Sequence, residues 1–181
     1  MASPDPILPK PAVPRPAPLL GPTRASSTLV AGASLAALLD AWATWYRHGV
    51  AVDYAAGEPG VWVADLTSAA STSRTAGVLY LLALASAGIA LLVWVSRVRA
   101  NARLLGHAAH PLRRTLAIVA WFAVSLFAAG VTLLVHGTTV AELAVLATLD
   151  SVTAVVQLLV GVLAIVMIRV ETNQRGRAMR G

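Results

Sequence analysis

Four apolar runs, each uninterrupted by proline, constrain this chain more than any other feature of its sequence. They cover residues 27–46, 77–95, 115–135 and 146–168. A helix needs about 20 residues to cross a hydrocarbon core of about 30 Å, and lipid offers no hydrogen-bond partner to backbone groups outside a helix or a closed barrel. The runs therefore predict an all-α integral membrane four-helix bundle with four transmembrane helices.

The composition agrees with a chain that resides in lipid. Hydrophobic residues make up 57% of the sequence and charged residues 12%, and the mean hydropathy is +0.74, unlike a soluble domain. The net charge of +6 comes from short basic clusters between the apolar runs. We therefore expect membrane lipids as partners and no nucleic acid. The chain has no cysteine, which excludes disulfides and thiolate metal sites.

Proline divides the chain into domains. Eight of the ten prolines lie within the first 24 residues, and proline at this density removes backbone donors and favours extended chain. Residues 1–26 are therefore predicted to be a disordered, Pro-rich cytoplasmic tail. Residues 27–170 are predicted to form the four-span transmembrane domain, and residues 171–181 a short cytoplasmic tail.

The distribution of basic residues predicts the orientation of the helices. Lysine and arginine gather in both tails and in the connection between the second and third runs. These residues are Lys10, Arg15, Arg24, Arg97, Arg99, Arg103, Arg113, Arg114, Arg169, Arg175, Arg177 and Arg180. The other two connections hold only Arg47 and Arg74, beside four carboxylates. By the positive-inside rule, we expect a multi-pass protein of the cell (plasma) membrane with both termini cytoplasmic.

Aromatic residues lie near the ends of the apolar runs, as in interfacial belts. They are Trp42, Trp45, Tyr46, Tyr80 and Trp94. The first outer connection is predicted over residues 48–74, where Asp65 is suited to cap a helix that leads into the second run.

The stretch WVSRVRANARLLG, residues 94–106, predicts where the second helix leaves the membrane. Its arginines surround the helix, which fits contact with anionic headgroups and not a nucleic-acid stripe. Gly106 is suited to the end of the helix. We expect six interface anchors, and these are Trp94, Arg97, Arg99, Asn101, Arg103 and Arg169.

Two stretches resemble a family of actinobacterial membrane proteins called domain of unknown function 4328. LLVWVSRVRANARLLG matches its motif at Trp94, Arg97, Arg99 and Asn101, and LDSVTAVVQLLVGVLAIVMIRVETNQRGRA matches its final helix at Asp150, Arg169, Thr172 and Gln174. The resemblance covers residues 27–178. The chain departs from the family after the second helix, where HAAHPLRRTLAIVAWF lacks the usual Trp- and Pro-containing segment. The resemblance implies a membrane protein and brings no established activity.

Polar residues within the runs are the candidate site, because an ionisable group in lipid is costly and normally faces the bundle interior. In the fourth run, the helical period places Asp150, Gln157 and Gly161 on one face. In the first run, Gly32 and Ala36 form a small-residue pair. Three further residues, Asp40, Thr44 and Arg47, prolong that side, so we expect the first and fourth helices to pack along these faces. The predicted cluster consists of Asp40, Arg47, Arg74, His136, Asp150 and Gln157.

This cluster has three interpretations. The favoured one is that Asp40 and Asp150 form structural ion pairs with Arg47, Arg74 or His136 and so hold the helices in register. The second is that the two carboxylates face each other and form a proton or cation site. The third is a polar pocket for a lipid or small molecule, or no cluster at all.

No pattern in the chain supports catalysis, a cofactor or a metal. His107 and His110 are three residues apart but have no carboxylate or thiol nearby in sequence, and no phosphate-binding loop or nucleophile motif is present. The leading hypothesis is thus a non-enzymatic membrane protein, an accessory or interaction component that binds another membrane protein or a second copy of itself. The alternative is a small transporter or channel component with a proton or ion site near Asp40 and Asp150.

Overall fold

The structure, a computed structural model, describes residues 17–104 and 112–178, which form four helices. Their bounds are α1 Leu20–Ala55, α2 Val63–Leu104, α3 Leu112–Leu134 and α4 Val140–Ala178. All four helices contain a stretch that is long and apolar enough to cross a membrane. The prediction of an all-α chain with four such helices is therefore confirmed.

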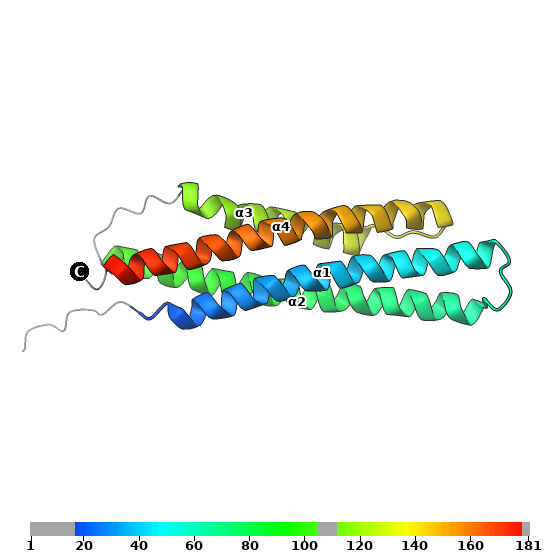
Figure 1. The fold of residues 1–181 in the computed structure, drawn as a ribbon, viewed down its shortest axis with the longest axis horizontal. Coiled ribbons are helices and arrows are strands. Elements are labelled where there is room, and N and C mark those ends of the chain that lie inside the picture. The colour runs from blue at the N-terminus through cyan, green and yellow to red at the C-terminus, as the bar shows by residue number, and fades with distance from the viewer. Residues whose placement is uncertain (1–16, 105–111, 179–181) are drawn as a thin grey trace, which may run out of the picture.

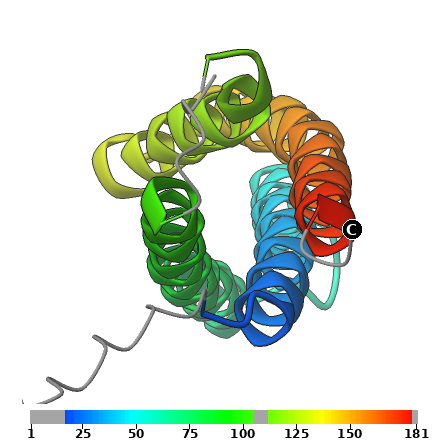
Figure 2. The same ribbon diagram turned by 90° about the vertical axis from the view of Figure 1, so that its left-hand side faces the viewer.

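The helices run antiparallel to their neighbours in the chain (Figure 1). Seen along the bundle, they follow one another around it in the order α1, α2, α3, α4 (Figure 2). Helix α1 packs against α2 and α4, and α3 packs mainly against α4. We call the end at which α1 and α3 begin the terminal end, and the opposite end the hairpin end.

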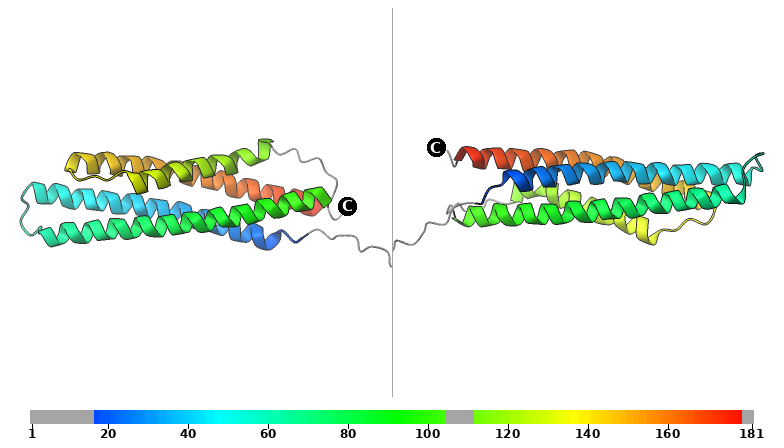
Figure 3. Two further views of the ribbon diagram at one scale, coloured as in Figure 1. Left: turned by 180° about the vertical axis from the view of Figure 1, so that it is seen from behind. Right: turned by 90° about the horizontal axis from the view of Figure 1, so that it is seen from below.

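The helices extend well beyond the predicted apolar runs. Helix α1 has 36 residues and α2 has 42, so each is about 50–60 Å long, against a hydrocarbon core of about 30 Å. The first connection spans only residues 56–62, where we expected residues 48–74. Both helices therefore project past the α3–α4 hairpin at the hairpin end (Figure 3).

Helical structure extends past the predicted bounds of the transmembrane domain at both ends of the described chain. Helix α1 begins at Leu20, and Thr23 and Ser26 are buried, although we placed the disordered tail up to residue 26. Pro22 is compatible with this because it lies in the first turn, where its missing N–H costs no helical hydrogen bond. Helix α4 likewise continues through residues 171–178 of the predicted C-terminal tail. Residues 1–16, Gly106, His107 and His110 lie outside the described residues.

Side chains cap the two helices that begin at the hairpin end. The Asp65 carboxylate accepts a hydrogen bond of 2.7 Å from the backbone N–H of Trp62, so Asp65 caps α2 from within its first turn and not from the N-cap position that we predicted. At α4, the backbone N–H of Glu142 donates to the Thr139 hydroxyl at 3.2 Å, and the Thr139 N–H donates to the Glu142 carboxylate at 3.1 Å. This reciprocal pair is a capping box, and the sequence TVAE carries its signature.

Small residues and hydrogen bonds hold α1 against α4. The Thr23 and Thr172 hydroxyls are 2.8 Å apart, and the indole N–H of Trp45 donates to the Ser151 hydroxyl at 2.7 Å. Between these points, a Cβ built on Gly161 would lie only 2.5 Å from Ser34 Oγ. Small side chains of α1 are buried along this contact and beside α2, namely Ala33, Ser34, Ala37 and Ala41.

The predicted role of Gly32 is wrong. Gly32 is exposed, and a Cβ built on it would meet nothing within 4 Å. The small-residue contact of α1 uses the neighbouring face, which includes Ser34 and Ala37. The expectation that α1 and α4 pack together holds, and Asp40 and Thr44 of the predicted face are buried, but Gly32 takes no part in the contact.

The close contact at Gly161 generates a stability prediction. We expect Gly161→Ala to destabilise the bundle by about 1–3 kcal/mol, because the added methyl must displace Ser34 or separate α1 from α4. Thermal unfolding of the purified protein in detergent micelles measures this loss. Gly32→Ala is the matched control and should not lower the unfolding temperature. In the double variant, Ser34→Ala should restore part of the stability that Gly161→Ala loses. If Gly161→Ala is as stable as Gly32→Ala, the close packing at Gly161 is contradicted.

Candidate functional site

Asp40 of α1 and Asp150 of α4 line one small pocket inside the bundle. The volume open to the centre of a water molecule is about 10 Å³, which is about enough for one water molecule. The lining residues come from all four helices and are Ala37, Asp40, Tyr80, Ala128, Thr132, Asp150, Thr153, Ala154 and Gln157. The two carboxyl groups are close enough to interact electrostatically.

Neighbouring residues position both carboxyl groups. The Thr44 hydroxyl donates a hydrogen bond of 2.9 Å to Asp150 Oδ2, and thereby links α1 to α4. Asp40 is 6% exposed and points at Gly77 of α2, where a built Cβ would lie 3.4 Å from Asp40 Oδ1. The same Cβ would lie 3.2 Å from Thr132 Cγ2 of α3. Glycine at position 77 therefore leaves the space that the Asp40 carboxyl occupies.

Gln157 connects the pocket to the opposite side of the bundle. Its Oε1 accepts a hydrogen bond of 2.7 Å from the Tyr80 hydroxyl, so α2 and α4 are joined across the diagonal. Gln157 is fully buried, yet its Nε2 has no hydrogen-bond partner among the described residues. A buried amide N–H without a partner costs about 1–3 kcal/mol, so this donor is available to a small ligand in the pocket.

The three predicted cations lie outside this site. The Arg47 guanidinium donates to the Gly137 carbonyl at 3.2 Å, and Arg74 is exposed. His136 is exposed, with its Nδ1 3.3 Å from the Leu134 carbonyl. Within residues 17–104 and 116–174, whose side chains the structure describes, no cationic side chain is paired with Asp40 or Asp150. The ion pairs that we favoured are therefore not formed, because these cations sit beyond the pocket toward the hairpin end.

The polar groups that line the pocket limit which ligands it can bind. It offers two carboxyl groups, hydroxyl groups and one free amide N–H. Over the described part of the chain, no group of three or more histidine, aspartate and glutamate side chains is arranged to hold a metal ion. Two carboxyl groups that line one pocket repel each other when both are charged, and protonation of one of them removes this repulsion.

Tyr80 belongs to the site, although we expected it at the membrane interface. It is 2% exposed and lies in the interior. The sequence contained a signal for this inward orientation. An alternating spacing of three and four residues marks the inner stripe of a packed helix, and it is followed by Gly77, Tyr80, Leu84, Ala87 and Leu91.

The terminal end holds the predicted interface anchors, and two of them are buried. Trp94 is 4% exposed, and its indole N–H donates to the Thr23 hydroxyl at 3.1 Å. Asn101 is 2% exposed and bonds the backbone of Ala17 twice, accepting from its N–H at 2.9 Å and donating to its carbonyl at 2.8 Å. Both residues therefore tie the start of α1 to α2, whereas we expected them to anchor the helix in the interface.

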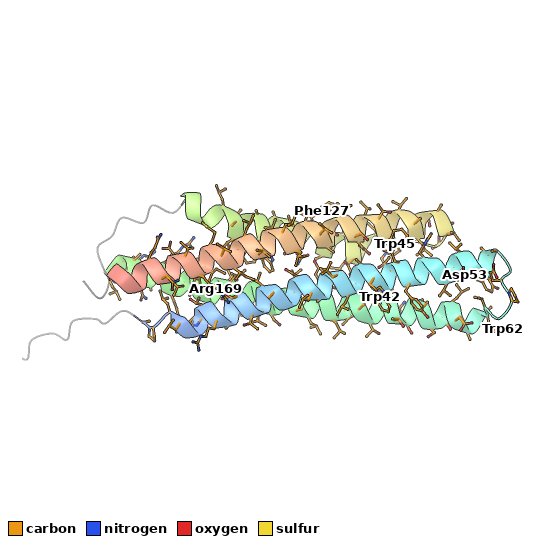
Figure 4. All side chains as sticks on the ribbon, in the orientation of Figure 1. Trp42, Trp45, Asp53, Trp62, Phe127 and Arg169 are labelled. Atoms are coloured by element: carbon orange, nitrogen blue, oxygen red, sulfur yellow. The ribbon has the colours of Figure 1, made fainter. Side chains whose placement is uncertain are left out.

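The arginine anchors and the outer aromatic residues do face outward. The exposed arginines are Arg97, Arg99, Arg103 and Arg169. Figure 4 shows Arg169 toward the terminal end and Trp62 at the tip of the α1–α2 hairpin. Trp42 is 61% exposed and Phe127 of α3 is also 61% exposed, as expected of side chains that face lipid.

Comparison with known proteins adds no family: no family model matches the sequence, and no curated protein or solved structure matches it either. The resemblance to domain of unknown function 4328 therefore stays a prediction.

The unpaired carboxyl groups generate a stability prediction with a defined sign. We expect Asp40→Asn and Asp150→Asn each to raise the stability of the bundle at alkaline pH, by an amount of the order of 1 kcal/mol, because each removes one of two like charges. The gain should shrink as the pH falls and the wild-type carboxyl groups become protonated. Thermal unfolding in micelles across a pH series measures it.

Arg74→Gln is the control for this series and should leave the unfolding temperature unchanged at every pH. If instead both asparagine variants and Arg74→Gln lose stability together, Arg74 neutralises the carboxyl groups and the ion-pair interpretation is correct.

Proposed function

We propose that the protein is a non-enzymatic, four-span membrane protein that binds a proton at Asp40 and Asp150 and acts as a small proton-coupled transport or channel component. The single observation that carries this proposal is the meeting of two carboxyl groups in one pocket without a cationic partner among the described residues. Ionisable groups within membrane spans typically mark proton or ion pathways. This reverses the order of the two hypotheses drawn from the sequence.

A proton suits this pocket better than a dehydrated metal cation. The free atom of Gln157 is an N–H donor, since its oxygen already accepts from Tyr80, and a donor repels a cation. The pocket volume of about 10 Å³ accommodates one water molecule. A water molecule in the pocket can accept a hydrogen bond from the Gln157 amide and donate one to a carboxyl oxygen. It can therefore pass a proton to or from Asp40 and Asp150, which we call the acid pair.

The orientation in the membrane follows from charge. Exposed arginines of α2 and α4 lie at the terminal end, while Asp53, Glu58 and Asp65 lie at the hairpin end. By the positive-inside rule, the terminal end is cytoplasmic, and the protein resides in the plasma membrane. The acid pair then lies in the outer half of the membrane. The partners of the protein are membrane lipids, and another membrane protein or a second copy completes a transport assembly.

Infrared spectroscopy tests proton binding directly. In protein reconstituted into lipid, we expect a carbonyl stretching band of a protonated carboxyl group whose intensity changes with pH. Asp40→Asn and Asp150→Asn should each remove or shift this band, because each dissolves the pair. Glu58→Gln, which changes an exposed loop carboxylate, is the control and should keep it. A band that stays unchanged in both asparagine variants would rule out the proposed site.

A further inference from the structure

Three buried hydrogen-bond donors lie on the facing sides of α3 and α4. They are Gln157 Nε2, Ser125 Oγ and Trp121 Nε1, and none has a hydrogen-bond partner in the part of the chain that the structure describes. Gln157 and Trp121 are fully buried and Ser125 is 2% exposed. Three unpartnered donors in one helix contact are costly unless a small ligand binds them.

The antiparallel register places these donors in one column. Ala128 packs in one cluster with Ala154, and a Cβ built on Gly161 would lie 3.7 Å from Trp121 Nε1. Between these two levels, Ser125 of α3 is therefore opposite Gln157 of α4. The column begins at the pocket, which Gln157 lines, and extends about one helical turn toward the terminal end.

Ser34 of α1 supplies a hydrogen-bond acceptor at the Trp121 end of the column. Its hydroxyl donates to the Val30 carbonyl at 3.0 Å, so its lone pairs remain free to accept. Gly161 brings Ser34 close, and the side chain absent from Gly161 also leaves the Trp121 indole N–H accessible. Buried donors without partners and a nearby acceptor suit bridging water molecules, which typically make about three hydrogen bonds to buried polar groups.

An apolar layer closes the bundle next to Trp121, on the side toward the terminal end. Its side chains come from all four helices, are at most 4% exposed and form one core cluster, and they include Val30, Ala87, Leu91, Ile118, Ala164 and Ile168. Besides Trp121, the cluster contains the Trp94 indole, whose N–H is already bonded to the Thr23 hydroxyl. An apolar constriction excludes water and so interrupts a hydrogen-bonded chain.

We propose that water bound along Gln157, Ser125 and Trp121 forms a proton path from the acid pair, and that the apolar layer around Ile118 is the closed gate of this path. The inference rests on the proposed function and adds the route and its regulation. A proton enters the chain from a carboxyl group and moves along it by successive exchange of hydrogen bonds. It reaches the terminal end only when the apolar layer becomes hydrated.

Opening the gate by substitution tests this path. We expect Ile118→Ser, in liposomes with a trapped pH dye and a potassium ionophore for charge balance, to collapse a pH gradient about tenfold faster than the wild type. Val119→Ser is the matched control, because Val119 is 58% exposed on the lipid-facing side of the same turn. It should behave like the wild type. Ala87→Ser makes a smaller polar change in the same layer, and it should also leak if Ile118→Ser does not fold.

Double variants show whether the leak uses the path. Ile118→Ser with Asp40→Asn, and Ile118→Ser with Ser125→Ala, should both lose most of the leak. A leak that persists in both folded double variants would overturn the path, and so would folded gate variants that do not leak at all. Failure of the path alone leaves the infrared carboxyl band of the wild type intact, whereas failure of the proposed function removes the dependence of that band on Asp40 and Asp150.

Discussion

The close approach of α1 to both α2 and α4 is the constraint on which the other features of this bundle depend. Lipid tails are as apolar as leucine, so helices in a membrane associate through packing, small residues and hydrogen bonds between them. Here Gly161 admits Ser34 from α1, and Gly77 leaves room for Thr132 beside the Asp40 carboxyl. A Cβ at position 161 must displace Ser34 or separate α1 from α4, and a Cβ at position 77 crowds Thr132 of α3.

Hydrogen bonds secure this approach at several depths. Trp94 and Thr172 both reach Thr23 near the terminal end, and Thr44 reaches Asp150 at the level of the pocket. Tyr80 adds a bond across the bundle to Gln157. Each such bond contributes about 1 kcal/mol in a membrane interior. Together they define one rotation and one register for each helix, and the acid pair is a consequence of that arrangement.

The polarity of the interior changes along the bundle axis. Around Asp40 and Asp150 the side chains are small or polar, whereas the cluster around Leu91, Ile118 and Ile168 is apolar. Carboxyl groups and unpartnered donors therefore occupy one part of the interior, and tight apolar packing seals the next. Both proposals use this arrangement of a polar site next to an apolar layer. Such an arrangement allows a proton to bind at the polar site without a continuous proton flow through the bundle.

Much of the fold was predictable because hydropathy and capping are local properties. The four apolar runs predicted four helices long and apolar enough to span a membrane, and Asp65 marked the first turn of α2. The ends of the helices were less predictable, since hydropathy marks the apolar stretch of each helix and not the residue at which the helix ends. The inner face of α4 was also predictable, because Asp150, Gln157 and Gly161 share one side.

The sequence by itself determined the number of helices, their apolar surfaces and the presence of two acidic groups within the spans. Only the tertiary structure decided that these acids meet each other and not Arg47, Arg74 or His136, and that Tyr80 and Trp94 point inward. The reason is that pairing across helices depends on the rotation of each helix about its axis and on its register with its neighbours. Contacts between residues far apart in the chain, such as Ser34 with Gly161, set both.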